Sequence, residues 1–149
     1  SNIFNVVKDY NSGYILMHML GDPENMQENP EYDNVVKSIQ IFLKTKILKL
    51  EELGFNNIII DPGFGFGKSI DDNFKILKEL KSFQSLNRPI IVGLSRKSMI
   101  YKTLSITPEE SLNGTTALNI LALERGANIL RVHDAREALQ CINLLKKLN

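Results

Sequence analysis

Residues able to do chemistry follow each of four short apolar segments of the sequence. The clearest case is Asp61, which ends the run Asn57-Ile58-Ile59-Ile60 and opens a turn with glycine at every second position and Lys68 at its far end. Similar groups follow the other three segments: His18; Ser95, Arg96 and Lys97; and Arg131, His133 and Asp134. A charged side chain next to a buried strand costs free energy unless it meets a partner or a ligand, so the recurrence indicates a binding site.

These groups carry a net positive charge. The cations are Lys68, Arg96, Lys97 and Arg131, and the carboxylates are Asp61 and Asp134. Because an arginine fork binds phosphate through two N–H groups and a lysine binds it as a point charge, we expect a ligand with an anionic, phosphate-like part. An ionised carboxylate such as Asp61 accepts two hydrogen bonds side by side, which suits the amino-pyrimidinone edge of a purine or pterin.

The glycine-rich turn matches neither of the common nucleotide-binding motifs. Gly63-Phe64-Gly65-Phe66-Gly67-Lys68-Ser69 is one residue short of a P-loop, because the first glycine of that motif would fall on Pro62. The last glycine of the dinucleotide fingerprint would fall on Lys68. The turn therefore predicts a backbone-rich loop without identifying a nucleotide as its ligand.

The chain has few residues that bind metals. Two histidines, His18 and His133, and one distant cysteine, Cys141, predict no metal site built from protein ligands. Met17, Met19 and Cys141 are residue types that are usually buried, so the sequence favours them as core residues. A single cysteine also excludes an internal disulfide and favours a reducing compartment.

The elements that must position these groups alternate along the chain. Apolar runs predict strands at residues 14–19, 58–60, 89–94 and 129–132. Apolar residues at three- and four-residue steps predict helices at 3–10, 35–53, 107–126 and 134–148, the third with a possible break near Gly114. A further helix, capped by Asp71 or Asp72, extends toward Phe83. In the last helix, Leu139, Ile142, Leu145 and Leu148 are expected to face inward.

This alternation predicts an α/β fold of parallel (β/α) units, with four strands and about five helices. The carboxyl ends of parallel strands share one rim, so the polar groups that follow the strands are expected to meet. Four such units form either a small open sheet or half of an eight-stranded TIM barrel. A whole barrel typically needs about 250 residues, so a chain of 149 residues fits half.

Composition and charge exclude several classes of protein. A hydrophobic content of 43% is that of an ordinary globular domain, and a formal charge of +1 is too small to indicate nucleic acid or a membrane surface as the main partner. No apolar run approaches the ~20 residues of a membrane span, and the N-terminus lacks the pattern of a signal peptide. We therefore expect a soluble, cytoplasmic protein.

Four motifs resemble dihydropteroate synthase in type and order. They are Leu16-Met17-His18-Met19 with Gly21, Pro23, Met26, Gln27, Asn29-Pro30 and Tyr32-Asp33; Asp61-Pro62-Gly63-Phe64-Gly65-Phe66-Gly67-Lys68; Gly93-Leu94-Ser95-Arg96-Lys97-Ser98; and Arg125-Gly126-Ala127 with Arg131-Val132-His133-Asp134. The resemblance implies that residues 1–149 are a single partial domain, the fifth to eighth units of a TIM barrel preceded by one helix. The N-terminal half of that barrel is then absent, since the family's earlier motifs are missing.

The resemblance implies a transferase of folate biosynthesis, in which 4-aminobenzoate displaces diphosphate from 6-hydroxymethyl-7,8-dihydropterin diphosphate. It assigns the amino-pyrimidinone edge of the pterin to Asp61, a carbonyl or nitrogen of the pterin ring to Lys97, and the departing diphosphate to Arg131 with His133. The implied substrate-binding residues are Met17, Met19, Phe66, Lys68, Gly93 and Ser95. The aminobenzoate pocket would be bordered by Phe66, Lys68, Ser95 and Lys97. Sulfonamide drugs mimic the aminobenzoate that binds there.

The family also implies Mg²⁺ bound with the diphosphate, but its protein ligand is an asparagine on the absent first strand, so no metal ligand is expected in this chain. The expected protein partner is a second copy, as a dimer, or the missing barrel half. Because the missing strands supply contacts, the 149-residue chain alone is expected to have little activity. Two alternatives are a non-catalytic barrel fragment and a pterin-binding corrinoid-type methyltransferase domain, whose Gly-x-Ser-Asn motif differs from Ser95-Arg96-Lys97.

Overall fold

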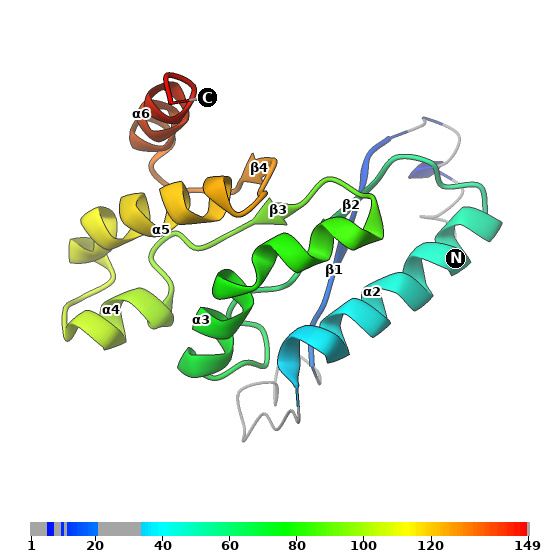
Figure 1. The fold of residues 1–149 in the computed structure, drawn as a ribbon, viewed down its shortest axis with the longest axis horizontal. Coiled ribbons are helices and arrows are strands. Elements are labelled where there is room, and N and C mark those ends of the chain that lie inside the picture. Colours follow the sequence, from blue (N-terminus) through cyan, green and yellow to red (C-terminus); the bar gives the residue numbers. More distant parts are fainter. Residues whose placement is uncertain (1–5, 8–9, 11, 21–33, 149) are drawn as a thin grey trace.

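The computed structural model describes residues 6–7, 10, 12–20 and 34–148 of the chain. The helix expected at residues 3–10 lies mostly outside these ranges, and the motif residues from 21 to 33 lie wholly outside them. The fold below is that of the described residues. It is built from strands that alternate with helices along the chain, as the sequence predicts (Figure 1).

The strands form one parallel row. Their bounds are β1 (Tyr14–Met17), β2 (Ile58–Asp61), β3 (Ile91–Val92) and β4 (Ile129–Leu130). β1 pairs with β2 and β3 pairs with β4, both in parallel. A parallel bridge between Ile60 and Ile90 joins the two pairs, so the strands lie side by side in the order β1-β2-β3-β4. Their carboxyl ends therefore point to one edge, as expected.

Helices connect successive strands, and one more helix follows the last strand. Their bounds are α2 (Val35–Glu52), α3 (Ile70–Lys78), α4 (Ser98–Leu104), α5 (Leu112–Glu124) and α6 (Ala135–Leu145), with 3₁₀ turns η1 (Leu80–Leu86) and η2 (Glu109–Ser111). In Figure 1, α2 and α3 lie in front of β1 and β2, and α6 lies at the edge of the molecule, where it packs against α5. No helix in the described ranges is long and apolar enough to cross a membrane.

Local signals explain where two of these helices begin. The Asn34 side chain accepts a hydrogen bond from the N–H of Lys37 and caps α2. The cap of α3 is Ser69, not Asp71 or Asp72 as predicted. Its hydroxyl accepts from the N–H of Asp72 while the Asp72 carboxylate accepts from the N–H of Ser69, which is a capping box.

The segment between β3 and β4 contains two helices and a 3₁₀ turn, where the sequence predicted one helix. Helix α4 was not predicted, because its seven residues are too few to show a clear apolar period. Thr107 and Glu110 form the expected reciprocal cap, but they open the short turn η2, which leads into α5. Gly114 lies inside α5 without a break, so the predicted interruption there is wrong.

The two faces of the strand row differ in cover. Leu16, Ile58 and Ile60 are buried and belong to the core beneath the helices. Ile15, which points to the opposite face, is 50% exposed. The core therefore lies between the strands and the helices, and the other face of the row is open next to β1.

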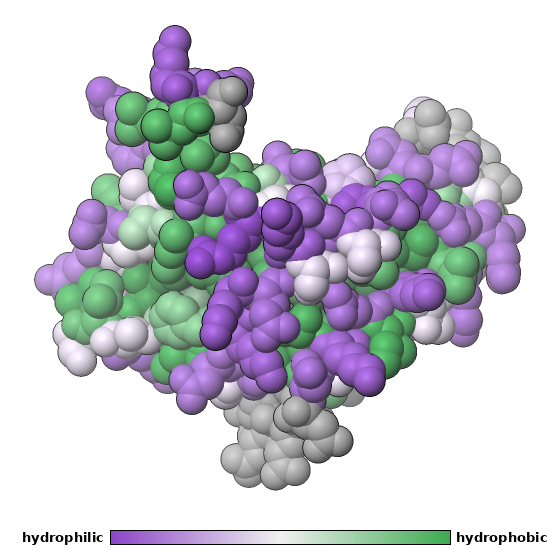
Figure 2. Space-filling view, viewed as in Figure 1, coloured by the Kyte–Doolittle hydropathy of each residue, from purple (hydrophilic) through white to green (hydrophobic). Residues whose placement is uncertain are grey.

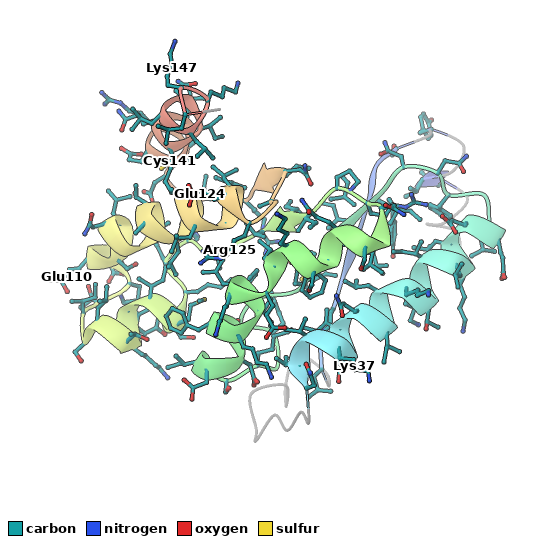
Figure 3. The ribbon with its side chains drawn as sticks, viewed as in Figure 1. Lys37, Glu110, Glu124, Arg125, Cys141 and Lys147 are labelled. Carbon is teal, nitrogen blue, oxygen red and sulfur yellow. The ribbon has the colours of Figure 1, made fainter. Side chains whose placement is uncertain are left out.

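Helix α6 departs from its predicted packing. Leu139 and Leu148, expected to face inward, are 56% and 79% exposed. The side of α6 that faces α5 carries Ala138 and Cys141 instead, and Cys141 is buried as expected (Figure 3). Figure 2 shows the resulting hydrophobic side chains on the surface of α6.

Candidate functional site

A cavity opens at the carboxyl ends of β3 and β4. Its volume is about 390 Å³, and its lining consists of Gly93, Ser95, Lys97, Arg131, Val132 and His133. The sequence had pointed to all of these except Val132, whose apolar side chain carries no chemical signal of its own. Since Lys97 contributes an ammonium and Arg131 a guanidinium, the cavity suits an anionic ligand.

The residues around the cavity continue the register of the strands. In the ladder between β3 and β4, Ile91 pairs with Ile129, 38 positions later in the chain. Beyond the strand ends, the residues whose side chains meet are also 38 positions apart. The continued pairs are Gly93 with Arg131, Ser95 with His133, and Arg96 with Asp134. Parallel pairing of two very short strands thus brings the polar groups of both loops together.

Gly93 leaves room for the guanidinium of Arg131. A Cβ at position 93 would lie 3.1 Å from both Nε and Nη2 of Arg131, closer than almost all real Cβ contacts. The main chain of Arg131 is held by its N–H, which donates to the carbonyl of Val92 at 2.8 Å. A glycine here therefore allows the guanidinium to lie directly against β3.

Ser95 joins the two loops inside the cavity. The side chain is 5% exposed, and Oγ lies 2.9 Å from Nδ1 of His133. The same oxygen accepts a hydrogen bond from the backbone N–H of His133 at 3.3 Å. The imidazole is thus anchored through one ring nitrogen while the rest of the exposed ring borders the cavity.

Arg96 and Asp134 form a second link beside the cavity. The guanidinium donates from Nη2 and Nε to the two carboxylate oxygens, at 2.7 and 3.2 Å. These hydrogen bonds lower the pKa of the Asp134 carboxyl and raise that of Arg96. The Arg96 N–H also donates to Oγ1 of Thr115, and the residue has a φ of 55°. Because Arg96 is neutralised in this way, it is not available as the free anion-binding cation that the sequence suggested.

Asp61 lies at the end of β2 and is 3% exposed. Its Oδ1 accepts a hydrogen bond from the N–H of Gly63 at 2.7 Å. Burial raises the pKa of the carboxyl above its ordinary value, while the Gly63 N–H and the cations Arg131, Lys97 and Lys68 oppose the rise. The effect of these three cations places Asp61 within the electrostatic reach of the cationic cavity, next to but not among the lining residues.

Lys97 extends from the loop after β3 toward the loop after β2. Its Nζ lies 4.7 Å from the centroid of the Phe66 ring, within the range of a cation–π contact. Burial and the neighbouring Arg131 lower the pKa of Lys97, and Asp61 opposes this. Lys97 therefore connects the Asp61 end of the site with the Arg131 end.

Lys68 does not lie at the rim. It is 3% exposed, and its Nζ donates to the carbonyls of Gly63 and Phe66 at 2.7 and 2.8 Å and more weakly to that of His18 at 3.4 Å. Burial, with the nearby charge of Lys97, lowers the pKa of Lys68 to about 8. The lysine expected to border the substrate pocket is therefore enclosed beneath the glycine-rich loop.

The first strand contributes less to the site than expected. His18 is 5% exposed, its ring packs edge-on against Phe42, and burial lowers its pKa to about 4. A neutral, enclosed imidazole of this kind is a core residue. Met17 and Met19 are both partly buried, and neither lines the cavity at β3 and β4.

Asn73 is a site-supporting residue that the sequence did not reveal. It lies in the first turns of α3 and is 2% exposed. Its Oδ1 accepts a hydrogen bond from the N–H of Gly65 at 2.7 Å, and its Nδ2 donates to the carbonyl of Ser69 at 2.6 Å. An asparagine near a helix start usually signals only a cap, so its contact with the loop was not predictable from spacing.

The donor set does not fit a divalent metal. Within the described residues, no group of three or more His, Cys, Asp or Glu side chains is arranged to hold an ion. Mg²⁺ requires oxygen ligands, whereas the cavity is lined by cationic and imidazole nitrogens and one hydroxyl. The described side chains alone therefore do not form a magnesium site.

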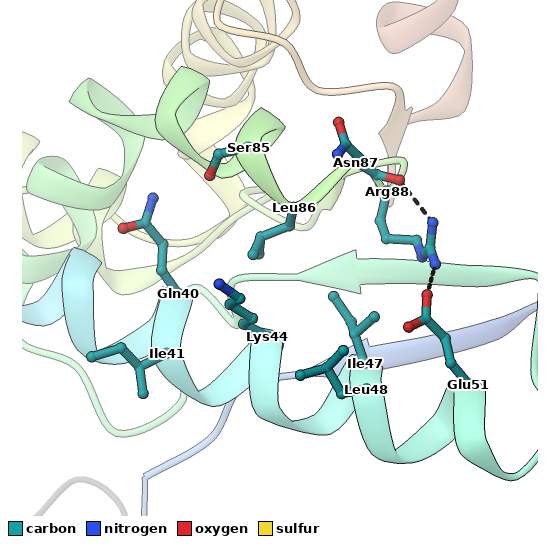
Figure 4. Close-up of a pocket in the computed structure, with 10 residues that line it drawn as sticks. All are labelled: Gln40, Ile41, Lys44, Ile47, Leu48, Glu51, Ser85, Leu86, Asn87 and Arg88. Carbon is teal, nitrogen blue, oxygen red and sulfur yellow. Dashed lines mark hydrogen bonds and ion pairs between the residues drawn. The ribbon is translucent and has the colours of Figure 1, made fainter.

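A second cavity of about 500 Å³ lies between α2 and η1, away from the strand ends (Figure 4). Two of its charged groups are already paired, since Arg88 forms an ion pair with Glu51, and Lys44 is the third charged residue of the lining. Gln40 donates to the carbonyl and hydroxyl of Ser82. This groove offers neither a free anion-binding pair nor an acid–base pair, so the cavity at β3 and β4 is the better functional candidate.

Comparison with known proteins points to one family. Residues 1–133 match the family described as pterin binding enzyme. Over 133 residues, the chain is 40% identical to the dihydropteroate synthase of Escherichia coli (strain K12), a match that covers 88% of this chain and 47% of that protein. A bifunctional dihydropteroate synthase/dihydropteroate reductase of Helicobacter pylori is 38% identical over 148 residues, covering 99% of this chain and 39% of the relative.

Solved structures agree with this result. The Yersinia pestis dihydropteroate synthase in a sulfonamide drug complex superposes with a TM-score of 0.95 at 33% identity, covering 99% of this chain and 55% of the other. The Thermus thermophilus enzyme in complex with 4-aminobenzoate gives a TM-score of 0.92 at 30% identity, with 98% and 60% covered. The fold is thus part of a TIM barrel, and the chain spans about half the length of the curated relatives it matches.

Proposed function

Because this chain belongs to the family of pterin-binding enzymes, we propose that it forms part of a dihydropteroate synthase and holds the pterin and the leaving diphosphate. The observation that carries the proposal is the meeting of Lys97, Arg131 and His133 around one cavity, with the buried Asp61 within reach of the same cations. The relatives named dihydropteroate synthase support a role in folate biosynthesis.

In the proposed reaction, the amine nitrogen of 4-aminobenzoate forms a bond to the exocyclic methylene carbon of the dihydropterin. The bond from that carbon to the diphosphate oxygen breaks, its electron pair leaves with diphosphate, and the amine loses a proton. Negative charge therefore grows on the leaving group. Arg131 and His133 would stabilise that charge from fixed positions, which is how electrostatic preorganisation lowers a barrier. No side-chain nucleophile is needed.

Asp61 would orient the pterin. An ionised carboxylate can accept the paired N–H groups of the amino-pyrimidinone edge, and the Gly63 N–H holds one of its oxygens in place. Lys97 would donate to a carbonyl or nitrogen of the pterin ring from its position between Asp61 and Arg131. Met17 and Met19, near the end of β1, remain proposed contacts of the pterin.

The aminobenzoate side of the site is proposed to lie at Phe66, Ser95 and Lys97. Ser95 and Lys97 line the same cavity, and Lys97 contacts the Phe66 ring, which supports placing Phe66 next to that space. Related proteins have been solved with a sulfonamide drug and with 4-aminobenzoate. We propose the same class of substrate here. We also propose that Mg²⁺ binds together with the diphosphate and that its protein ligand lies outside the described side chains.

The test is a chimaera of the Escherichia coli relative in which its matched segment is replaced by the corresponding 133 residues of this chain. We expect the chimaera to convert 4-aminobenzoate and the dihydropterin diphosphate to dihydropteroate and diphosphate, measured by product chromatography. The control carries Arg131→Ala in the same chimaera and should lose most of this turnover. A chimaera that is folded by circular dichroism and monodisperse, yet inactive, would reject the proposal.

A further inference from the structure

The ammonium of Lys97 rests on two residues of the glycine-rich loop. Its Nζ lies over the ring of Phe66, and a Cβ added to Gly65 would come within 3.1 Å of the same atom. Gly65 has a φ of 87°, a conformation that side-chain-bearing residues rarely adopt. The position of the Lys97 ammonium thus depends on the positions of Gly65 and Phe66.

The backbone of each of those two residues forms a hydrogen bond with a buried polar side chain. The N–H of Gly65 donates to Oδ1 of Asn73 at 2.7 Å, and the carbonyl of Phe66 accepts from Nζ of Lys68 at 2.8 Å. Lys68 and Asn73 are 3% and 2% exposed, and neither lines the cavity. They therefore bond to the backbone of the loop, whereas Lys97 contacts the Phe66 ring.

Lys68 also links the start of the loop to the residue that follows β1. Its Nζ donates to the carbonyl of Gly63 at 2.7 Å and reaches that of His18, beyond β1, at 3.4 Å. In the described ranges its bonding partners are carbonyls, since the ion pairs there join other residues. A buried ammonium without a paired carboxylate is costly, and this cost is offset by the carbonyls that accept its hydrogen bonds and by the nearby charge of Asp61.

We propose that Lys68 and Asn73 are positioning residues, which hold Phe66 and Gly65 so that the Lys97 ammonium is directed into the catalytic cavity. Lys68 is then a support of the loop and not a substrate contact. This inference rests on the proposed function for its effect on turnover, but the geometric part can be tested without any substrate.

The test uses the 149-residue chain with Lys68→Met and Asn73→Leu, which nearly preserve side-chain volume and remove the hydrogen bonds. The readout is the nuclear Overhauser contact between the Lys97 side chain and the Phe66 ring. We expect both variants to lose it while the His18–Phe42 ring contact, 5.0 Å between centroids, persists. The matched control is Lys78→Met, at an exposed lysine of helix α3, the helix that also contains Asn73. It should retain both contacts.

A folded Lys68→Met protein that keeps the Lys97–Phe66 contact would overturn the inference. If the variants do not fold, amide hydrogen exchange of the unaltered chain decides the matter. The Gly65 N–H, bonded to Asn73, should exchange at least about tenfold more slowly than that of the exposed Gly13, as expected for a buried hydrogen-bonded amide. Equal rates would reject the proposed support.

The effect on catalysis is measured in the chimaera. Lys68→Met is expected to raise KM for 4-aminobenzoate about tenfold, on the scale of one hydrogen bond to a charged group, and to leave the affinity for inorganic diphosphate unchanged. An unchanged KM would overturn the positioning role. If the unaltered chimaera is inactive but the Lys97–Phe66 contact depends on Lys68, the proposed function fails and the inferred support stands.

Discussion

The hydroxyl oxygen of Ser95 lies 2.9 Å from Nδ1 of His133 and also accepts a hydrogen bond from the backbone N–H of that histidine. With its oxygen already an acceptor, the hydroxyl can donate its proton to Nδ1, which leaves the ring proton on Nε2. In that tautomer the imidazole presents an N–H donor on its free side. Such a donor suits a diphosphate oxygen.

Removal of this hydroxyl should weaken diphosphate binding. In Ser95→Ala, we expect the affinity for inorganic diphosphate to fall about fivefold, the equivalent of roughly 1 kcal/mol for one hydrogen bond. Equilibrium dialysis measures the change. Ser85→Ala, at an exposed position on η1, is the control and should bind normally. An unaltered affinity in Ser95→Ala would contradict the role of the hydroxyl in orienting His133.

Substitution of Gly93 should displace Arg131. In Gly93→Ala, the new Cβ would press on the guanidinium, so diphosphate affinity is expected to fall about tenfold, the scale of one charge-assisted hydrogen bond. Calorimetric titration with inorganic diphosphate measures this. Gly13→Ala is a matched control, because its Cβ would meet nothing closer than 3.5 Å. Equal affinities in the two variants would show that Arg131 does not need this space.

Neutralisation of Asp61 should reduce activity and increase stability. Asp61→Asn is expected to lower turnover in the chimaera on the order of 100-fold, by loss of one preorganised contact.

Because the folded-state pKa of Asp61 is raised, the native protein holds this proton more tightly, and its stability falls as pH rises from 3.8 through the folded value.

The stability gain of Asp61→Asn should therefore depend on pH. The variant is expected to melt at a higher temperature than the unaltered chain at pH 7, where the buried carboxylate carries its charge cost. Near pH 3.5 the advantage should disappear, since Asp61 is then mostly protonated in both folded and unfolded states. Calorimetric melting at the two pH values decides this, and a variant less stable at pH 7 would refute it.

His18 should make the protein sensitive to acid. Its pKa is lowered from 6.5 to about 4, so the unfolded chain binds the proton more readily, and stability is lost as pH falls from 6.5 to 4. The loss attributable to His18 is about 3 kcal/mol at most, from the conversion of pKa shift to free energy. His18→Gln should flatten the pH dependence of urea unfolding in this range. An unchanged pH dependence in His18→Gln would contradict this prediction.

The open face of the strand row should promote self-association of the 149-residue chain. Ile15 is 50% exposed and Ile129, at the outer strand β4, is 37% exposed. Strand edges with apolar side chains recruit further strands unless they are blocked. Light scattering after size exclusion is expected to give a mass above that of a monomer, and Ile15→Lys should reduce it. A clean monomer would contradict this expectation.

Much of the fold and part of the site were predictable from the sequence. The alternation of strands and helices followed from apolar periodicity, and the positions of Asp61, Ser95, Lys97 and His133 at strand ends followed from it in turn. These signals are local, because the types of the residues two, three or four positions away along the chain determine whether a segment forms a strand or a helix. The short helix α4 and the cap at Ser69 were missed, since seven residues carry little periodicity and several polar residues compete as caps.

By itself, the amino-acid sequence determined the parallel β/α order, the cationic character of the strand ends and the family resemblance, because these depend on residue type and spacing along the chain. Only the tertiary structure decided that Ser95 meets His133, that Arg96 is neutralised by Asp134, and that Lys68 lies beneath its loop. Those contacts join residues brought together by strand register and loop packing, and whether a cation faces solvent, a carboxylate or backbone carbonyls is settled by three-dimensional burial.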